Sequence, residues 1–208
     1  QKAENKAVYR RPDMMSNVDN INNGLYIGIG NSASHRYSVQ WTGDIGSSNQ
    51  DIFEAVIDMV KCGDNCLPYV HPDCGGHTGN PDKETFLRWM EFGALSTVLR
   101  PHCTVSVLRF REPWAYNDKA VEDAVRAYIK LRYRLLPLLY TEAYKSYRDG
   151  SPICRGLGWN YPEDKKALAC KTQYMIGSNL LVAPVFGGEL FRVPGGFYAT
   201  PVDVTYYN

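Results

Sequence analysis

Polar side chains that could bind or react with a substrate recur along the chain at nearly even intervals. They are Asn17, Asp44, Asp73 and His102, which are 27, 29 and 29 residues apart. Each follows a short apolar run of the kind that forms a strand, and one strand–helix unit takes about 30 residues. The spacing therefore predicts that all four project from the same end of neighbouring parallel strands. In a β/α barrel that end carries the active site.

Asp44 is the best candidate for a catalytic group. It follows Trp41, whose indole offers a flat apolar wall, and Gly43, which allows close approach of the backbone. A carboxyl group beside such a wall loses solvation, which would raise its pKa and suit a general acid. The indole could also stack on the apolar face of a sugar ring. An Asp that only forms a turn or caps a helix would have the same local sequence, so a catalytic and a structural role for Asp44 both stay open.

The other two positions also have structural readings. Asp73 precedes Gly75 and Gly76 and could simply form a turn. His102 follows Arg-Pro and could be a hydrogen-bonded histidine of the core. The Arg-Glu-Pro-Trp segment at 111–114 is expected to form a structural ion pair in a loop, packed under its indole.

Composition excludes several classes of protein. The chain has 208 residues, of which 44% are hydrophobic and 22% charged, and its net charge is +1. It is too apolar and too balanced in charge to be disordered, and it has no basic field for nucleic acid. Its apolar runs are far shorter than the roughly 20 residues of a membrane helix. Six cysteines are too few for a disulfide scaffold, so free thiols are expected.

Short apolar runs alternate with helical patterns, which indicates an α/β protein with parallel strands. The periodicity predicts strands over residues 9–17, 36–41, 67–70 and 97–99, and helices over 48–63, 81–96 and 117–149. Ser48, with Asp51 three residues later, and Asn80 are the expected N-caps. Gly63 should end the first helix, Pro137 should kink or split the third, and Gly150 should stop it. Beyond residue 151, short strands and Gly/Pro turns predict a β-rich tail.

Several segments together resemble glycoside hydrolase family 31, the α-glucosidase and α-xylosidase family. Residues 36–44 (Arg-Tyr-Ser-Val-Gln-Trp-Thr-Gly-Asp) resemble its acid/base segment, and Asp73-Cys-Gly-Gly-His77 resembles its Asp-x-Gly-Gly-Phe loop. Further motifs follow in the family's order at Arg88-Trp89, Arg100-Pro-His102, Arg111-Glu-Pro-Trp114, 131–140, 150–155 and 175–185. The resemblance covers about residues 10 to 186.

The resemblance implies a partial (β/α)8 TIM barrel, strands five to eight, followed by the start of a β-sandwich domain. Residues 1–150 would form the second half of the catalytic barrel. Residues 151–208 would form the barrel end and the start of the C-terminal β-domain. The chain is then expected to be a truncated piece that requires the rest of its own barrel. Its N-terminus is polar and starts at Gln1 without an apolar signal region, but a signal could have been removed. The compartment is therefore unassigned, with a secreted or periplasmic one slightly favoured.

The chemistry that the resemblance implies is retaining hydrolysis of α-linked sugars in an oligosaccharide or glycoside. Asp44 matches the general acid/base, and His102 matches a histidine that hydrogen-bonds sugar hydroxyls. Trp41 and Asp73 match residues bordering the subsite of the terminal sugar. No metal and no cofactor is implied, and neither nucleic acid nor a membrane is an expected partner.

Three departures from the family pattern qualify this reading. The nucleophile motif, an Asp followed closely by Asn-Glu, is absent; Asp13 and Asp19 lie on or just after the fifth strand and do not replace it. The nucleophile is therefore expected upstream of this chain. Asn17 stands where the family usually has a sugar-binding Arg, and His77 stands where it has Phe.

These departures leave several functions open. The shorter Asn17 makes room near the sugar ring, which allows galactose or N-acetylgalactosamine in place of glucose. His77 adds a hydrogen-bonding group, so we expect both residues to contact substrate. The alternatives are an α-galactosidase or α-N-acetylgalactosaminidase, a transglycosylase of the same family, and an inactive sugar-binding or structural fragment.

Overall fold

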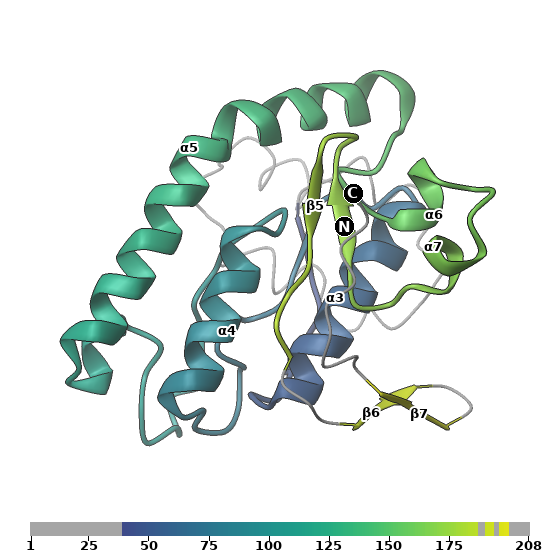
Figure 1. Ribbon diagram of the computed structural model, residues 1–208. Helices are drawn as coiled ribbons and strands as arrows, with labels where there is room; N and C mark the ends of the chain where they lie inside the picture. The colour runs from purple at the N-terminus through teal and green to yellow at the C-terminus, as the bar shows by residue number, and fades with distance from the viewer. Residues whose placement is uncertain (1–38, 187–189, 194–195, 200–208) are drawn as a thin grey trace, which may run out of the picture.

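The computed structural model describes residues 39–186, 190–193 and 196–199 (Figure 1). The predicted strand over 9–17, and with it Asn17, lies outside the described residues, as do residues 36–38 of the next predicted strand.

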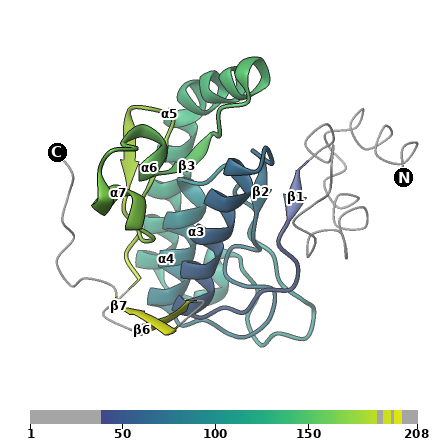
Figure 2. The same cartoon turned by 90° about the vertical axis from the view of Figure 1, so that its right-hand side faces the viewer.

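The N-terminal part of the described chain is a parallel strand–helix–strand unit. Strands β1 (Gln40–Trp41) and β2 (Val70–His71) pair in parallel, and helix α3 (Asn49–Asp64) connects them. Figure 2 shows both strands on one side of α3. Because parallel strands have the same direction, the residues that follow β1 and β2 emerge at one edge. The prediction of parallel strands at these two places is confirmed, with β2 starting at the end of the predicted range.

The strand predicted over 97–99 is wrong as a strand. The segment does run beside β2, because Cys74 and Pro101 form a parallel bridge and the Cys74 N–H donates to Arg100 O at 3.0 Å. Proline lacks the N–H that would extend the ladder, and the Thr97 hydroxyl donates to Val70 O instead. The pairing that brings residue 102 beside residue 73 is thus made by one bridge and side-chain bonds.

Helix α3 begins as predicted and ends differently. Ser48 is its N-cap, and Ser48 and Asp51 form a reciprocal capping box. Gly63 does not end the helix, which continues to Asp64. A Cβ atom on Gly63 would lie 2.7 Å from the carbonyl oxygen of Cys154, so this glycine lets a later strand pack against the helix.

Helix α4 (Lys83–Ala94) uses a different cap from the predicted one. The Asp82 side chain accepts a hydrogen bond from the Thr85 N–H, so Asp82 and not Asn80 is the N-cap. Asn80 Oδ1 instead accepts from the N–H groups of Leu108 and Arg109. An aspartate three residues before a free N–H is an equally good cap, and the asparagine is engaged by a loop distant in sequence.

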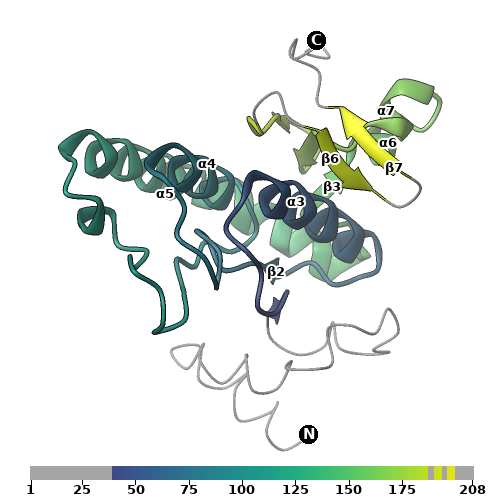
Figure 3. The same ribbon diagram turned by 90° about the horizontal axis from the view of Figure 1, so that it is seen from below.

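Helix α5 (Lys119–Asp149) is one continuous helix of 31 residues. Pro137 lies inside it without splitting it, and Figure 1 shows that the helix bends in its C-terminal half. Gly150 ends it in the left-handed conformation, as predicted. A short 3-10 helix, η2 (Pro113–Tyr116), precedes it. Figure 3 shows α3, α4 and α5 side by side.

The predicted β-rich tail is confirmed. An antiparallel sheet has the order β3-β4-β5, and a separate hairpin is formed by β6 and β7. The bounds are β3 (Cys154–Gly156), β4 (Tyr174–Ile176), β5 (Leu180–Val182), β6 (Leu190–Val193) and β7 (Gly196–Ala199). Two short helices that the sequence did not predict, α6 (Leu157–Asn160) and α7 (Lys165–Ala169), lie between β3 and β4.

The main core joins the helices to this tail. Its buried members include Phe53 and Val56 of α3, Trp89 of α4, and Tyr174 and Ile176 of β4. The Tyr174 hydroxyl also donates to Leu95 O at 2.8 Å. The strand–helix unit and the first tail sheet therefore share one hydrophobic core. Within the described part of the chain, no helix has the length and apolarity to cross a membrane.

All six cysteines are described, and all are free thiols, as expected. Burial raises the pKa of the Cys74 and Cys154 thiols to about 12. Both are therefore inert core residues rather than nucleophiles.

Candidate active site

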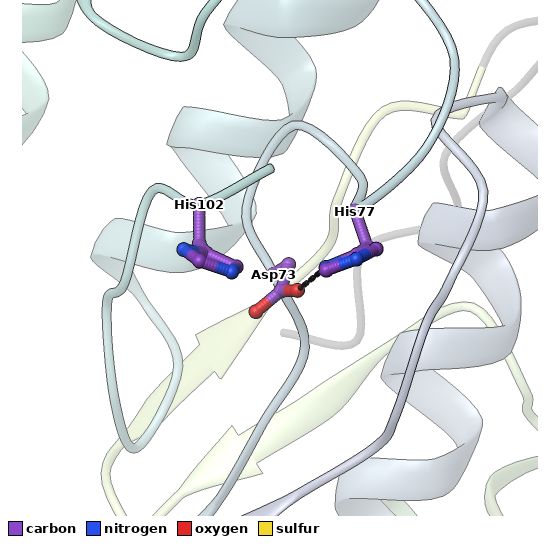
Figure 4. A group of neighbouring side chains, drawn as sticks. All are labelled: Asp73, His77 and His102. Atoms are coloured by element: carbon purple, nitrogen blue, oxygen red, sulfur yellow. Dashed lines mark hydrogen bonds and ion pairs between the residues drawn. The ribbon is translucent and has the colours of Figure 1, made fainter. Parts of the chain in front are cut away.

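A fully buried carboxylate, Asp73, holds the site together. Its Oδ1 accepts from the indole Nε1 of Trp41 at 2.9 Å and from Nη1 of Arg100 at 2.8 Å. Its Oδ2 is 2.9 Å from Nδ1 of His77 (Figure 4). The Asp73 carboxylate is 0% exposed. It thus connects β1, the loop after β2 and the segment before His102 through hydrogen bonds to one side chain. The guanidinium of Arg100 balances its charge.

His77 lies between two carboxylates from different strand ends. Its Nδ1 faces Asp73, and its Nε2 lies 3.5 Å from Oδ1 of Asp44. Because Asp73 only accepts, the network places a ring proton on Nδ1, and Nε2 is the nitrogen that faces Asp44. The His77 and His102 rings have centroids 5.4 Å apart and a tilted arrangement. Three of the four evenly spaced positions, 44, 73 and 102, therefore meet as predicted.

Trp41 does not form the apolar wall beside Asp44 that the sequence suggested. Trp41 is only 7% exposed, and its indole N–H binds Asp73. The Asp44 side chain is 65% exposed within the described chain. The desolvation of Asp44 by this indole is therefore not found, because the indole lies beneath the site and supports Asp73. Asp44 instead lies exposed at the edge of a buried hydrogen-bonded network.

The glycine loop that carries His77 is held by a buried arginine. Gly75 and Gly76 have φ angles of 96° and 81°. Arg111 donates from Nε and Nη2 to Gly76 O at 3.1 and 2.9 Å, and from Nη2 to Gly79 O at 2.8 Å. The expected loop ion pair under an indole is wrong: Glu112 and Trp114 are both exposed, and the guanidinium binds carbonyls. Arg111 orients the loop and thereby His77.

We expect Gly76→Ala to destabilise the protein and displace His77. A Cβ atom there would lie 2.5 Å from Ser47 Cα and closer still to Gly46 O, and both contacts are backbone that cannot rotate away. Together with the positive φ of 81°, this should cost about 3 kcal/mol of unfolding free energy, measured by urea denaturation.

Gly150→Ala is the matched control for this variant. Its φ is 80°, but no atom lies within 4 Å of its Cβ position. It should show only the smaller conformational part of the loss. Equal losses in the two variants would contradict the close approach of the loop to residues 46 and 47.

The arrangement could in principle hold a metal ion. Asp73, His77 and His102 each offer a ligand atom, and these atoms lie within 4.8 Å of one another. Both Asp73 oxygens, however, already face N–H donors, and one of these is the cationic Arg100. A cation would have to displace them and would stand beside a positive guanidinium. The donor set therefore fits a hydrogen-bonded network better than a metal site.

Two functional residues were missed from the sequence, Arg100 and Arg111. Arg100 lies two residues before His102, where a counter-charge for Asp73 could have been sought. Arg111 could have been sought as the group that binds the carbonyls of the glycine loop at Gly76 and Gly79. The predicted contact residue Asn17 lies outside the described residues.

Comparison with known proteins places these features in a family. Residues 28–142 match the sequence model for the glycosyl hydrolases family 31 TIM-barrel domain, and residues 150–205 match the model for the family 31 C-terminal domain. The chain is 34% identical over 156 residues to alpha-glucosidase 2 of Bacillus thermoamyloliquefaciens, covering 75% of this chain and 20% of that protein. It is 35% identical over 194 residues to an alpha-xylosidase of Emericella nidulans, covering 91% and 24%.

A solved structure agrees. The cycloalternan-forming enzyme from Listeria monocytogenes, in complex with a pentasaccharide substrate, superposes with a TM-score of 0.70 at 27% identity, covering 74% of this chain and 15% of that one. The chain spans about a fifth to a quarter of the length of the two curated relatives. The resemblance noted in the motifs is confirmed. The chain belongs to glycosyl hydrolase family 31 and comprises part of that family's TIM barrel together with its C-terminal domain.

Proposed function

We propose that this chain forms one side of the active site of a retaining α-glycosidase, with Asp44 as the general acid/base. The observation that carries the proposal is the position of Asp44: an exposed carboxyl group at the end of β1, 3.5 Å from a histidine anchored on a buried carboxylate. Relatives named as an alpha-glucosidase and an alpha-xylosidase support the reaction class.

In the proposed reaction Asp44 protonates the glycosidic oxygen while a second carboxylate attacks the anomeric carbon. Asp44 then takes a proton from the water that releases the sugar. We propose that the second carboxylate lies upstream of this chain, because the family's nucleophile motif is absent from it. In this scheme β1 and β2 are the sixth and seventh strands of the barrel. Residues 1–150 belong to its second half, and residues 151–208 lead into the C-terminal domain.

The proposed sugar contacts divide by burial. His77 and His102 are half-buried and adjacent, and we propose that both rings border the bound sugar. Asp73 and Trp41 lie behind them, and we propose that they support the subsite without bearing on the sugar directly. Asn17 remains a proposed contact that would widen the subsite.

The test is the stereochemistry of the product. The full gene product would be given aryl α-glucosides, α-xylosides, α-galactosides and α-N-acetylgalactosaminides, and the first-formed anomer would be followed by proton NMR. We expect the α anomer to appear first, because a double displacement retains configuration. A β anomer formed first would overturn the retaining mechanism. Failure to cleave any of the four would favour a sugar-binding or structural role.

Transfer to a sugar acceptor is a second candidate. A structural neighbour is named for the cycloalternan that it forms, and the exposed Asp44 could activate a sugar hydroxyl as readily as water. Product analysis at increasing acceptor concentration separates the two. A transferase gives mainly longer oligosaccharides, whereas a hydrolase gives mainly the free sugar.

A further inference from the structure

We propose that His77 is a positioning residue for Asp44, which holds the acid/base carboxyl group through Nε2 and shares a proton with it. The inference rests on the proposed function, since it assigns Asp44 a partner in that reaction. It concerns the position where the family pattern has a Phe, which has no nitrogen to offer.

The first step of the argument is that the His77 ring is fixed. Its Nδ1 is 2.9 Å from Oδ2 of Asp73, a carboxylate that is itself completely buried. The other oxygen of Asp73 is held by Trp41 and Arg100. Because the carboxylate cannot rotate away and only accepts, the imidazole is held with its Nδ1–H toward Asp73.

The second step is that Nε2 points at Asp44. The distance from Nε2 to Asp44 Oδ1 is 3.5 Å, and no other partner of the Asp44 side chain is found in the described ranges. This is longer than a hydrogen bond, but catalytic contacts commonly tighten when the substrate is bound. With its exposed side chain, Asp44 can close this gap by a small rotation.

The third step is the charge around the pair. His77 faces the carboxylates of Asp44 and Asp73, and the His102 ring lies at 5.4 Å. Arg100 binds Asp73, and Arg111 binds the loop at Gly76 O. The guanidinium of Arg100 offsets Asp73, which leaves the imidazole and Asp44 as a pair that can hold one proton between them.

This pairing gives the acid/base proton two places to reside. The proton resides either on Asp44, facing the Nε2 lone pair, or on Nε2, facing the Asp44 carboxylate. Removing the imidazole removes one of these two proton sites, and the pH dependence of kcat/KM reports that change. The form with the proton on Asp44 delivers it to the glycosidic oxygen as the C–O bond breaks, and water returns a proton in the second step. His77 undergoes no net change.

The test uses three variants of the full gene product. His77→Phe removes both nitrogens, His77→Asn can still donate to Asp73 but cannot reach Asp44, and His77→Gln reaches toward Asp44 but does not titrate. For His77→Phe we expect the alkaline limb of kcat/KM against pH to move down by about one unit. We expect kcat to fall about tenfold on substrates with poor leaving groups and much less on those with good ones.

The other two variants separate contact from titration. His77→Gln should recover part of kcat through its contact with Asp44, but the alkaline limb should stay at the lower pH. His77→Asn should behave like His77→Phe. An unchanged alkaline limb in all three, with losses that do not depend on the leaving group, would overturn the proposal and leave His77 a packing residue. If His77→Phe fails to fold, the Asn and Gln variants decide, because equal kcat values in these two would also overturn it.

Failure of the proposed function would look different. An Asp44→Asn variant assayed in parallel reports on the acid/base role by its own leaving-group dependence. If that dependence is absent, the role of Asp44 is wrong whatever the His77 variants show. If it is present while the His77 variants keep the wild-type pH profile, only the inference about His77 fails.

Discussion

Replacing Asp44 by Ala should lower kcat about 10²- to 10⁴-fold on glycosides with poor leaving groups. The loss should be small in the bond-breaking step of aryl glycosides whose leaving group needs no proton. The reason is that the carboxyl group supplies a proton only where the departing oxygen is basic. The measurement is kcat and kcat/KM for a series of aryl α-glycosides of increasing leaving-group basicity. A steeper dependence in the variant than in the wild type is the expected signature.

Azide gives a second readout for the same variant. A small anion needs no general base to attack the glycosyl–enzyme, so azide should accelerate Asp44→Ala and yield a glycosyl azide of retained configuration. Asp123→Ala is the matched control, because Asp123 is an exposed carboxylate on α5, distant in the chain, that pairs with Lys119 and Arg126. Such surface pairs contribute little, so this control should keep full activity. A loss in Asp44→Ala that is equal for all leaving groups would contradict the acid/base role.

Removing the Asp73 carboxylate should produce the largest loss of stability. Asp73→Ala removes the buried carboxylate that accepts from Arg100 and leaves the Trp41 N–H unsatisfied in a buried place. Breaking a buried charge pair by deleting one partner costs about 3 to 5 kcal/mol. The same change frees the His77 ring, so activity should fall together with stability. Urea denaturation and kcat on the preferred aryl glycoside measure the two effects.

Asp73→Asn is the sharper control. Its Oδ1 can still accept from Trp41 and Arg100, so it should retain more stability than the Ala variant. Its amide N–H₂ would face Nδ1 of His77, and two donors cannot bond. The ring must then carry its proton on Nε2, facing Asp44. We expect Asp73→Asn to fold and to lose activity nonetheless. An active Asp73→Asn enzyme would show that the tautomer of His77 does not matter.

Local signals in the sequence were sufficient for elements that depend on neighbouring residues. The capping box of Ser48 and Asp51 and the stop at Gly150 are made within one or two turns, so the spacing of the residues predicts them. The predictions for Asn80 and Gly63 were wrong because the groups that contact them are distant in the sequence. Asn80 is engaged by the loop at residues 108 and 109, and Gly63 admits the backbone of β3.

In the candidate site too, the part that depends on regular spacing could be predicted and the part that depends on distant contacts could not. The even spacing of Asp44, Asp73 and His102 predicted that they meet, because one strand–helix unit advances the chain by a regular step. The direction in which each side chain points could not be predicted in this way. Whether the Trp41 indole flanks Asp44 or lies beneath it on Asp73 depends on the position of Arg100, which a later segment brings into place.

The core shared by α3, α4 and β4 has a consequence for how the protein is made. The apolar side chains of α3 leave the ribosome long before Tyr174 and Ile176, which cover them in the finished protein. Contacts between segments so distant in the chain form slowly, because a long loop must close first. During that interval the nascent chain exposes apolar surface that is prone to aggregate, which is the condition under which chaperones are needed. Truncation at Gly150 would make that transient exposure permanent.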